Sequence, residues 1–194
     1  TEYGATQAGG DYYYSYGPGL FIVLNTNNYN AAEHAQTIEE AIQAYPDAAW
    51  RIVTIHQDIY GSGYDHSDTD GMILRTQLTP IFDQYDIDVV LQGHDHTYSR
   101  TKLLYGDGQT HDSYSMPLNE DGTDYDWDHA QNVATGELYT LWPEEGDAAG
   151  QASKQAFVEG NQCYTIEDTT GNTVVNPEGT LYMTANSASG SKFY

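Results

Sequence analysis

The chain has 194 residues, of which 39% are hydrophobic and 13% aromatic, and this is enough for one domain with a buried core. Its 6 Lys and Arg stand against 29 Asp and Glu, and a net charge of -23 would repel both nucleic-acid phosphates and anionic lipids. No apolar run approaches the roughly 18 residues of a membrane span, and the single cysteine, Cys163, excludes an internal disulfide and a cysteine-rich zinc module. We therefore expect no nucleic-acid partner and no membrane partner, and any bound metal must be held by histidines and carboxylates.

The chain begins with the pattern of a hairpin followed by a helix. Residues 12–16 are aromatic and prone to form a strand, a Gly-Pro-Gly turn follows, and residues 20–24 are an apolar run of strand length. Apolar residues then recur at helical spacing over 31–45, where Asn30 and Glu33 are placed as a capping box. The pattern predicts two strands that lead into an amphipathic helix.

Strand and helix patterns continue to alternate after this helix. Residues 51–55 and 87–91 are predicted strands, and between them 72–85 has helical periodicity with Pro80 as a kink or break. This order, which covers residues 20–92, is typical of parallel strands with helices on the faces of the sheet. We therefore predict an α/β fold.

Beyond Thr101 the patterns weaken. Residues 102–105 read as a strand, whereas 106–132 and 143–161 are polar, show little periodicity and are interpreted as surface insertions. Short β-like runs return at 163–166, 173–175 and 180–184. They are expected to complete a β-layer, so residues 1–194 are interpreted as one partial domain rather than as two domains.

Three of the seven histidines lie where a predicted strand ends. His56 follows the strand at 51–55, and His94 and His96 follow the strand at 87–91 in a Gly-His-Asp-His motif. Ligands of open α/β sheets gather beyond the carboxyl ends of the strands, and imidazole binds zinc, iron and related hydrolytic metals. The sequence therefore predicts a metal site at this edge of the sheet.

Three of the other four histidines lack such a context. His34 lies on the first predicted helix, and His111 and His129 lie in the polar insertions. All three are expected to be solvated.

A longer segment resembles a known family. Residues 53–56 (Val-Thr-Ile-His), 60–63 (Tyr-Gly-Ser-Gly) and 87–100, which include Gly-His-Asp-His-Thr-Tyr-Ser-Arg, resemble the later half of a calcineurin-like metallophosphoesterase. The nearest branch is the purple acid phosphatase-like one. The resemblance covers 12–100, and residues 182–190 are similar to a late segment of bacterial members. It implies the C-terminal part of a calcineurin-like phosphoesterase β-sandwich flanked by helices, with four α/β/β/α layers.

The resemblance also implies a chemistry. In this family two metal ions share a bridging carboxylate, and a metal-bound hydroxide attacks the phosphorus of a small phosphate ester. By resemblance, His56 and His94 bind the second metal, His96 binds the first, and His66 contacts the substrate or protonates the leaving group. The implied cofactors are Fe, Zn or Mn ions, which form a dinuclear centre in the intact enzyme.

Several ligands of the family motifs have no counterpart here. The family supplies its Asp, bridging Asp and Asn-His ligands from motifs that belong upstream of Thr1. The Gly-Asp pairs at 10–11, 106–107 and 146–147 do not follow apolar strands and are interpreted as chance pairs. We therefore expect a fragment of a larger enzyme, whose unpaired sheet edge associates with another copy or with the missing N-terminal half. The acidic, Lys-poor and Tyr-rich composition favours a secreted bacterial protein.

Two other functions stay open. One is a non-catalytic extracellular binding module that uses its tyrosines and the Asp-rich loop at 121–128. The other is a mononuclear, histidine-ligated hydrolase that acts on some other ester. Metal content, and the effect of upstream sequence on activity, separate these functions from a phosphoesterase.

Overall fold

The computed structural model describes residues 10–61, 69–161 and 164–186, which form three helices and ten strands. The helices are α1 (Ala31–Ala44), α2 (Thr69–Gln84) and α3 (Ala148–Gly160). The strands are β1 (Tyr12–Tyr16), β2 (Gly19–Val23), β3 (Trp50–Thr54), β4 (Val89–Gln92), β5 (Ser99–Gly106), β6 (Tyr114–Ser115), β7 (His129–Asn132), β8 (Leu138–Thr140), β9 (Tyr164–Ile166) and β10 (Thr180–Thr184). None of the described helices is both long and apolar enough to cross a membrane.

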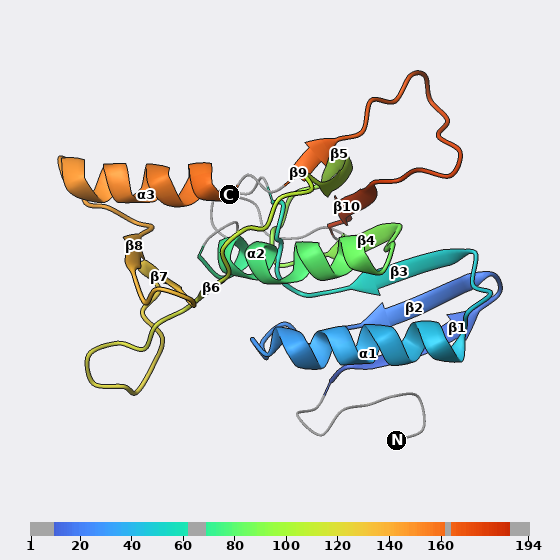
Figure 1. Cartoon of the computed structure of the whole chain (residues 1–194), viewed down its shortest axis with the longest axis horizontal. Helices are drawn as coiled ribbons and strands as arrows, with labels where there is room; N and C mark the ends of the chain where they lie inside the picture. Colours follow the sequence, from blue (N-terminus) through green and yellow to red (C-terminus); the bar gives the residue numbers. More distant parts are fainter. Residues whose placement is uncertain (1–9, 62–68, 162–163, 187–194) are drawn as a thin grey trace.

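Seven strands form one mixed sheet with the order β1-β2-β3-β4-β10-β5-β9. The strands from β2 through β3 and β4 to β10 are mutually parallel, and β1, β5 and β9 pair antiparallel at the two flanks. The late strand β10 lies between β4 and β5, so the C-terminal part of the chain completes the sheet that the first half begins (Figure 1). The α/β prediction is confirmed.

Helices α1 and α2 cover one face of this sheet (Figure 1). In the strands, every second side chain points toward these helices and is buried, because successive side chains of a strand lie on opposite faces of the sheet. The side chains between them are half-exposed. The buried cluster comprises Leu20, Ile22, Leu24, Ile38, Ala41, Val53, Ile55, Ile59, Leu74, Leu78, Phe82, Ile87, Val90, Leu104 and Tyr182. Burial of this apolar surface is the main stabilising term of the domain.

The opposite face of the sheet is only partly covered. Its side chains include Phe21, Ile52, Leu91 and Met183, all half-buried, and no described helix packs on it. A cavity of about 640 Å³ opens beside Trp50 and between β5, β10 and the loop that precedes β10. We call this surface the open face.

Predicted helix boundaries hold well in the first half. The Asn30 side chain accepts a hydrogen bond from the backbone N–H of Glu33 (3.4 Å) and caps α1 as predicted. The carboxylate of Glu33 instead accepts from the side chain of Asn28 (2.9 Å), so only half of the expected capping box forms. Pro80 lies inside α2 without ending it.

The polar insertions contain more regular structure than their sequence indicates. The small sheet β6-β7-β8 packs with α2 and α3 around a second buried cluster of Ile73, Tyr114, Met116, Ala130, Leu141 and Phe157. Helix α3 was not expected, because only Gly150 and Phe157 of its residues are buried and no apolar stripe marks it. The predicted strand at 173–175 is wrong: it lies in the loop before β10, where Val175 is 78% exposed.

Candidate metal centre

Parallel strands β3 and β4 bring two of the predicted ligands together. The Ile55 N–H donates to the carbonyl of Leu91 (2.9 Å), and the Gly93 N–H donates to the carbonyl of His56 (3.0 Å). Beyond these bonds the rings of His56 and His94 meet edge to face, with centroids 5.0 Å apart and planes at 64°. His56 is exposed and His94 is half-buried, so both rings face solvent at the carboxyl edge of the sheet.

The backbone at this edge takes an unusual conformation. His94 has φ of 65°, in the left-handed region that costs a non-glycine residue about 1–3 kcal/mol. The Asp95 N–H closes the turn with a 2.7 Å bond to the carbonyl of Gly93. The positive φ falls on His94 itself and not on Gly93, the residue before it.

The distance between the two rings matches that of two imidazoles on one metal ion. Two imidazoles bound tetrahedrally at about 2.0–2.1 Å would place their ring centroids about 5 Å apart. The observed separation of the His56 and His94 rings is 5.0 Å. These side chains would hold two positions of an ion, which would act as a Lewis acid toward a bound substrate.

The other predicted site residues do not complete a cluster in the described part of the chain. His96 is half-buried two residues beyond His94, and Asp95 between them is buried. Within residues 10–61, 69–161 and 164–186, no group of three or more His, Cys, Asp or Glu side chains is placed to hold a metal ion. His66 lies outside the described residues.

Behind the histidines, a buried polar network joins the ends of three parallel strands. The Asp58 carboxylate accepts from the side-chain amide of Gln92, at the end of β4, and from the Thr184 hydroxyl (2.5 Å), at the end of β10. Gln92 also donates to Thr184 (3.2 Å) and accepts from the Ile59 N–H (3.2 Å). Burial raises the pKa of Asp58, and the nearby charge of Asp95 acts in the same direction. This network has no signal in the sequence, because its members are far apart in the chain.

The expectation that His34 is solvated is wrong. His34 is fully buried, and its Nδ1 lies 2.6 Å from the carboxylate of Asp11, which is 1% exposed. Burial alone would lower the pKa of His34, but the bonds to Asp11 and to the Asn28 carbonyl, with the charges of Asp11 and Glu33, outweigh it and raise the pKa. Asp11 therefore has a structural partner, although we interpreted its Gly-Asp pair as chance.

The remaining histidines form local pairs. His111 Nε2 lies 2.8 Å from Asp107, and His129 Nδ1 lies 2.8 Å from Asp126, in all cases with partly exposed side chains. Within the Asp-rich loop, the Asp121 carboxylate accepts from the backbone N–H (2.9 Å) and hydroxyl (2.5 Å) of Thr123. These carboxylates bind neighbouring groups of the same turn.

One cationic side chain contacts the loop that follows His56. Arg75 donates from Nε to the carbonyl of Ile59 (2.6 Å), and its guanidinium lies 4.7 Å from the ring centre of Tyr60. It therefore braces the loop that follows β3. Arg51, at the start of the same strand, bonds to the carbonyl of Tyr85 (2.7 Å) and belongs to the opposite edge of the sheet.

Comparison with known proteins gives partial matches. No family model matches the chain. An uncharacterised protein of Mycobacterium tuberculosis is 37% identical over 57 residues, which are 29% of this chain and 11% of that protein. The Fe(3+)-Zn(2+) purple acid phosphatase 12 of Arabidopsis thaliana is 38% identical over 58 residues, 30% of this chain and 12% of that enzyme. The structure of a purple acid phosphatase from yellow lupin seeds aligns with a TM-score of 0.38 and 17% identity, over 67% of this chain and 31% of that one.

The matched segment thus spans only 11–12% of the length of these curated relatives. Purple acid phosphatases of three plants share about 35% identity with it. These matches support a relationship of the chain to calcineurin-like phosphoesterases at the level of the family.

Proposed function

We propose that this chain is part of the catalytic domain of a metal-dependent phosphoesterase that hydrolyses small phosphate esters. The observation that carries the proposal is the His56–His94 pair, whose rings lie 5.0 Å apart at the ends of adjacent parallel strands. This separation matches that of two imidazoles that share one ion, which is the observation in favour of the site. The plant relatives named as purple acid phosphatases, one of them an Fe(3+)-Zn(2+) enzyme, support the same chemistry.

The proposal extends to the rest of the centre. His96 would bind the other ion of the centre, and His66 would contact the substrate or the leaving group. Two ions need several anionic ligands to offset their charge. In the intact protein a further part of the polypeptide would supply these carboxylates, and Fe, Zn or Mn would occupy the dinuclear centre.

We propose that the open face is where this further part, or a second copy of the chain, makes contact. Half-buried apolar side chains such as Phe21 and Leu91 line it, and the exposed rings of β1 lie at its edge. The acidic, Tyr-rich composition supports an intact protein that works outside the cell.

Elemental analysis of the purified chain, together with His56→Ala and His94→Ala, tests the proposal. The matched control is His129→Ala, a histidine of the insertion paired with Asp126. We expect a bound ion that both site variants lose and the control keeps. Metal uptake that is absent, or unchanged in both site variants, would contradict the proposal.

Activity measurements separate the proposal from its rivals. With upstream sequence restored, we expect metal-dependent hydrolysis of p-nitrophenyl phosphate that His94→Ala abolishes. Hydrolysis by the present chain with one ion per molecule would favour a mononuclear hydrolase instead. Metal-free carbohydrate binding without hydrolysis would favour a binding module.

A further inference from the structure

A histidine and an aspartate meet in the interior beside the end of β2. His34 Nδ1 lies 2.6 Å from Asp11 Oδ2, and His34 Nε2 lies 2.7 Å from the backbone carbonyl of Asn28. His34 is fully buried, and Asp11 is 1% exposed. Both partners of the ring are acceptors, whereas a neutral imidazole carries only one N–H. The ring therefore satisfies both contacts as an imidazolium that donates from each nitrogen to an ionised Asp11 and to the carbonyl.

These two residues hold both ends of the loop between β2 and α1. The Asn25 N–H, at the start of the loop, donates to Asp11 Oδ1 (2.6 Å). The Asn28 carbonyl, three residues later, accepts from His34 (2.7 Å). We call the Asp11–His34 pair the clasp, because it joins the start of β1, the first turns of α1 and this loop.

The middle of the same loop contacts the candidate metal centre. The backbone N–H of His56 donates to the Thr26 hydroxyl (3.3 Å), and Thr26 is hydrogen-bonded in turn to the side chain of Gln57. Gln57 also donates to the Asn27 side chain (3.1 Å). The backbone of His56 is thus restrained from two sides: through its N–H by this loop, and through its carbonyl by the end of β4.

We propose that the clasp positions His56 for metal binding, with Asp11 and His34 acting through the loop of Asn25 to Asn28 rather than by touching the metal. This inference rests on the proposed function. Groups that orient a metal ligand from behind change metal affinity by roughly 10–100-fold when they are removed. The clasp fixes the conformation of the loop, and the loop restrains the backbone of His56. This backbone orients the His56 imidazole toward the ion shared with His94.

The first test is the exchange of the His56 backbone amide with solvent. We expect His34→Gln and Asp11→Asn to speed exchange at His56 at least tenfold, because its N–H loses a fixed acceptor. The amide of Ile55, which bonds to β4, should keep its wild-type rate and so reports that the sheet is intact. Unchanged exchange at His56 in a folded variant would overturn the proposal.

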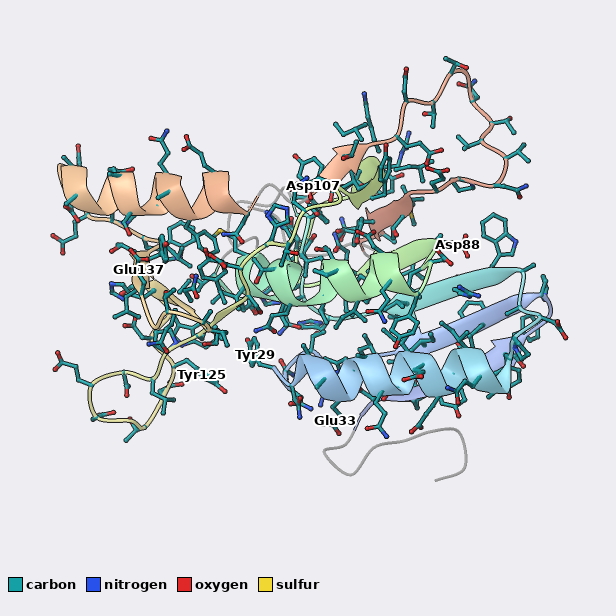
Figure 2. All side chains as sticks on the ribbon, in the orientation of Figure 1. Tyr29, Glu33, Asp88, Asp107, Tyr125 and Glu137 are labelled. Atoms are coloured by element: carbon teal, nitrogen blue, oxygen red, sulfur yellow. The ribbon has the colours of Figure 1, made fainter. Side chains whose placement is uncertain are left out.

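The second test is the affinity for Co(II), read from its visible absorption spectrum. We expect His34→Gln to weaken binding by about 10-fold or more. The matched control is His111→Gln, which also removes a histidine from an aspartate pair (2.8 Å), but one that lies in the insertion after β5. In Figure 2 Asp107, the partner of His111, lies on the other side of α2 from Glu33 of α1. Equal losses in both variants would contradict a positioning role.

A second variant keeps the test decisive if clasp variants fail to fold. Thr26→Val removes the hydroxyl that meets the His56 amide and leaves the clasp in place. It should reproduce the faster His56 exchange and the weaker Co(II) binding. In the wild type, nitrogen NMR should show both ring nitrogens of His34 protonated near neutral pH. A neutral ring there, or wild-type behaviour of Thr26→Val, would overturn the inference.

Failure of this inference is distinguishable from failure of the proposed function. If His56→Ala abolishes Co(II) binding while His34→Gln leaves it unchanged, the metal site stands and only the positioning role falls. If His56→Ala has no effect on Co(II) binding, the proposed metal site itself is wrong.

Discussion

The carboxyl ends of the parallel strands and the insertion after β5 use the same types of polar side chain. The bonds that these side chains make differ in how far apart the two partners lie along the chain. At the strand ends, Asp11 bonds to a histidine 23 residues away and Asp58 to a threonine 126 residues away, and all of these groups are buried. In the insertion, Asp107 and Asp126 bond to histidines only four and three residues away, with partly exposed side chains.

The two sets of bonds determine different features of the fold. Long-range buried bonds fix how strands and loops meet, and a buried group that loses its partner carries the full cost of desolvation. Short-range exposed bonds define a turn, and water replaces them at little cost. The same aspartate or histidine is therefore structural in one region and nearly dispensable in the other.

The largest expected effect is that of Asp58→Ala. It leaves the buried Gln92 amide and Thr184 hydroxyl without their carboxylate, and should lower the free energy of unfolding by about 3 kcal/mol. Urea unfolding measures this loss, with Asp126→Ala as the control in the insertion. A similar loss in both variants would contradict the difference between buried long-range bonds and exposed short-range bonds.

His34→Gln should follow, with a loss of about 2 kcal/mol in the free energy of unfolding near pH 6. The pKa of His34 is raised in the folded state, so its stabilisation is fully present below the unfolded value of about 6.5 and fades as the pH rises through the folded pKa. The difference between wild type and variant should therefore shrink in alkaline solution. Urea unfolding at a series of pH values measures it, and a difference that grows with pH would contradict the charged clasp.

His94→Gly tests the strained turn. Glycine adopts φ of 65° without steric cost, so the variant should gain about 0.5–1 kcal/mol of stability while it loses metal binding. Thermal unfolding and elemental analysis give the two quantities. His96→Gly is the control, because His96 is not among the described residues with positive φ, and a stability gain there would argue against relief of strain.

The smallest expected effect is that of Asp121→Ala in the Asp-rich turn. Its carboxylate is exposed and bonds only within the turn, so the urea midpoint should not move measurably. Thermal unfolding with and without Ca²⁺ provides a second reading. A calcium-dependent shift lost in the variant would show that the turn binds a ligand after all.

Much of the fold followed from periodicity. Between Tyr12 and Gln92 the helices have a period of 3.6 residues and the strands are short apolar or aromatic runs, and the structure matches both patterns. The place of β10 between β4 and β5 has no local signal, because pairing at such separation depends on the whole sheet. Helix α3 was missed because it buries only Gly150 and Phe157.

The candidate site, too, could be predicted from the sequence only in part. His56 and His94 were predicted to lie together because each follows a strand of the parallel sheet, and the structure brings their rings to 5.0 Å. His34 was misjudged, although it shares the buried stripe of α1 with Thr37, Ile38 and Ala41, and this spacing was the available signal. Its partner Asp11 could not be assigned, since nothing in the sequence states which residue a buried histidine will meet.

The open face and the net charge have opposite effects on the association of copies of the chain. Apolar side chains such as Ile52 and Met183 attract like surfaces, while a net charge of -23 keeps copies apart. Salt weakens only the repulsion, because at about 0.15 M the screening length falls to about 8 Å. If the proposed contact at the open face forms between copies, raising the ionic strength should favour association, and low salt should favour single copies.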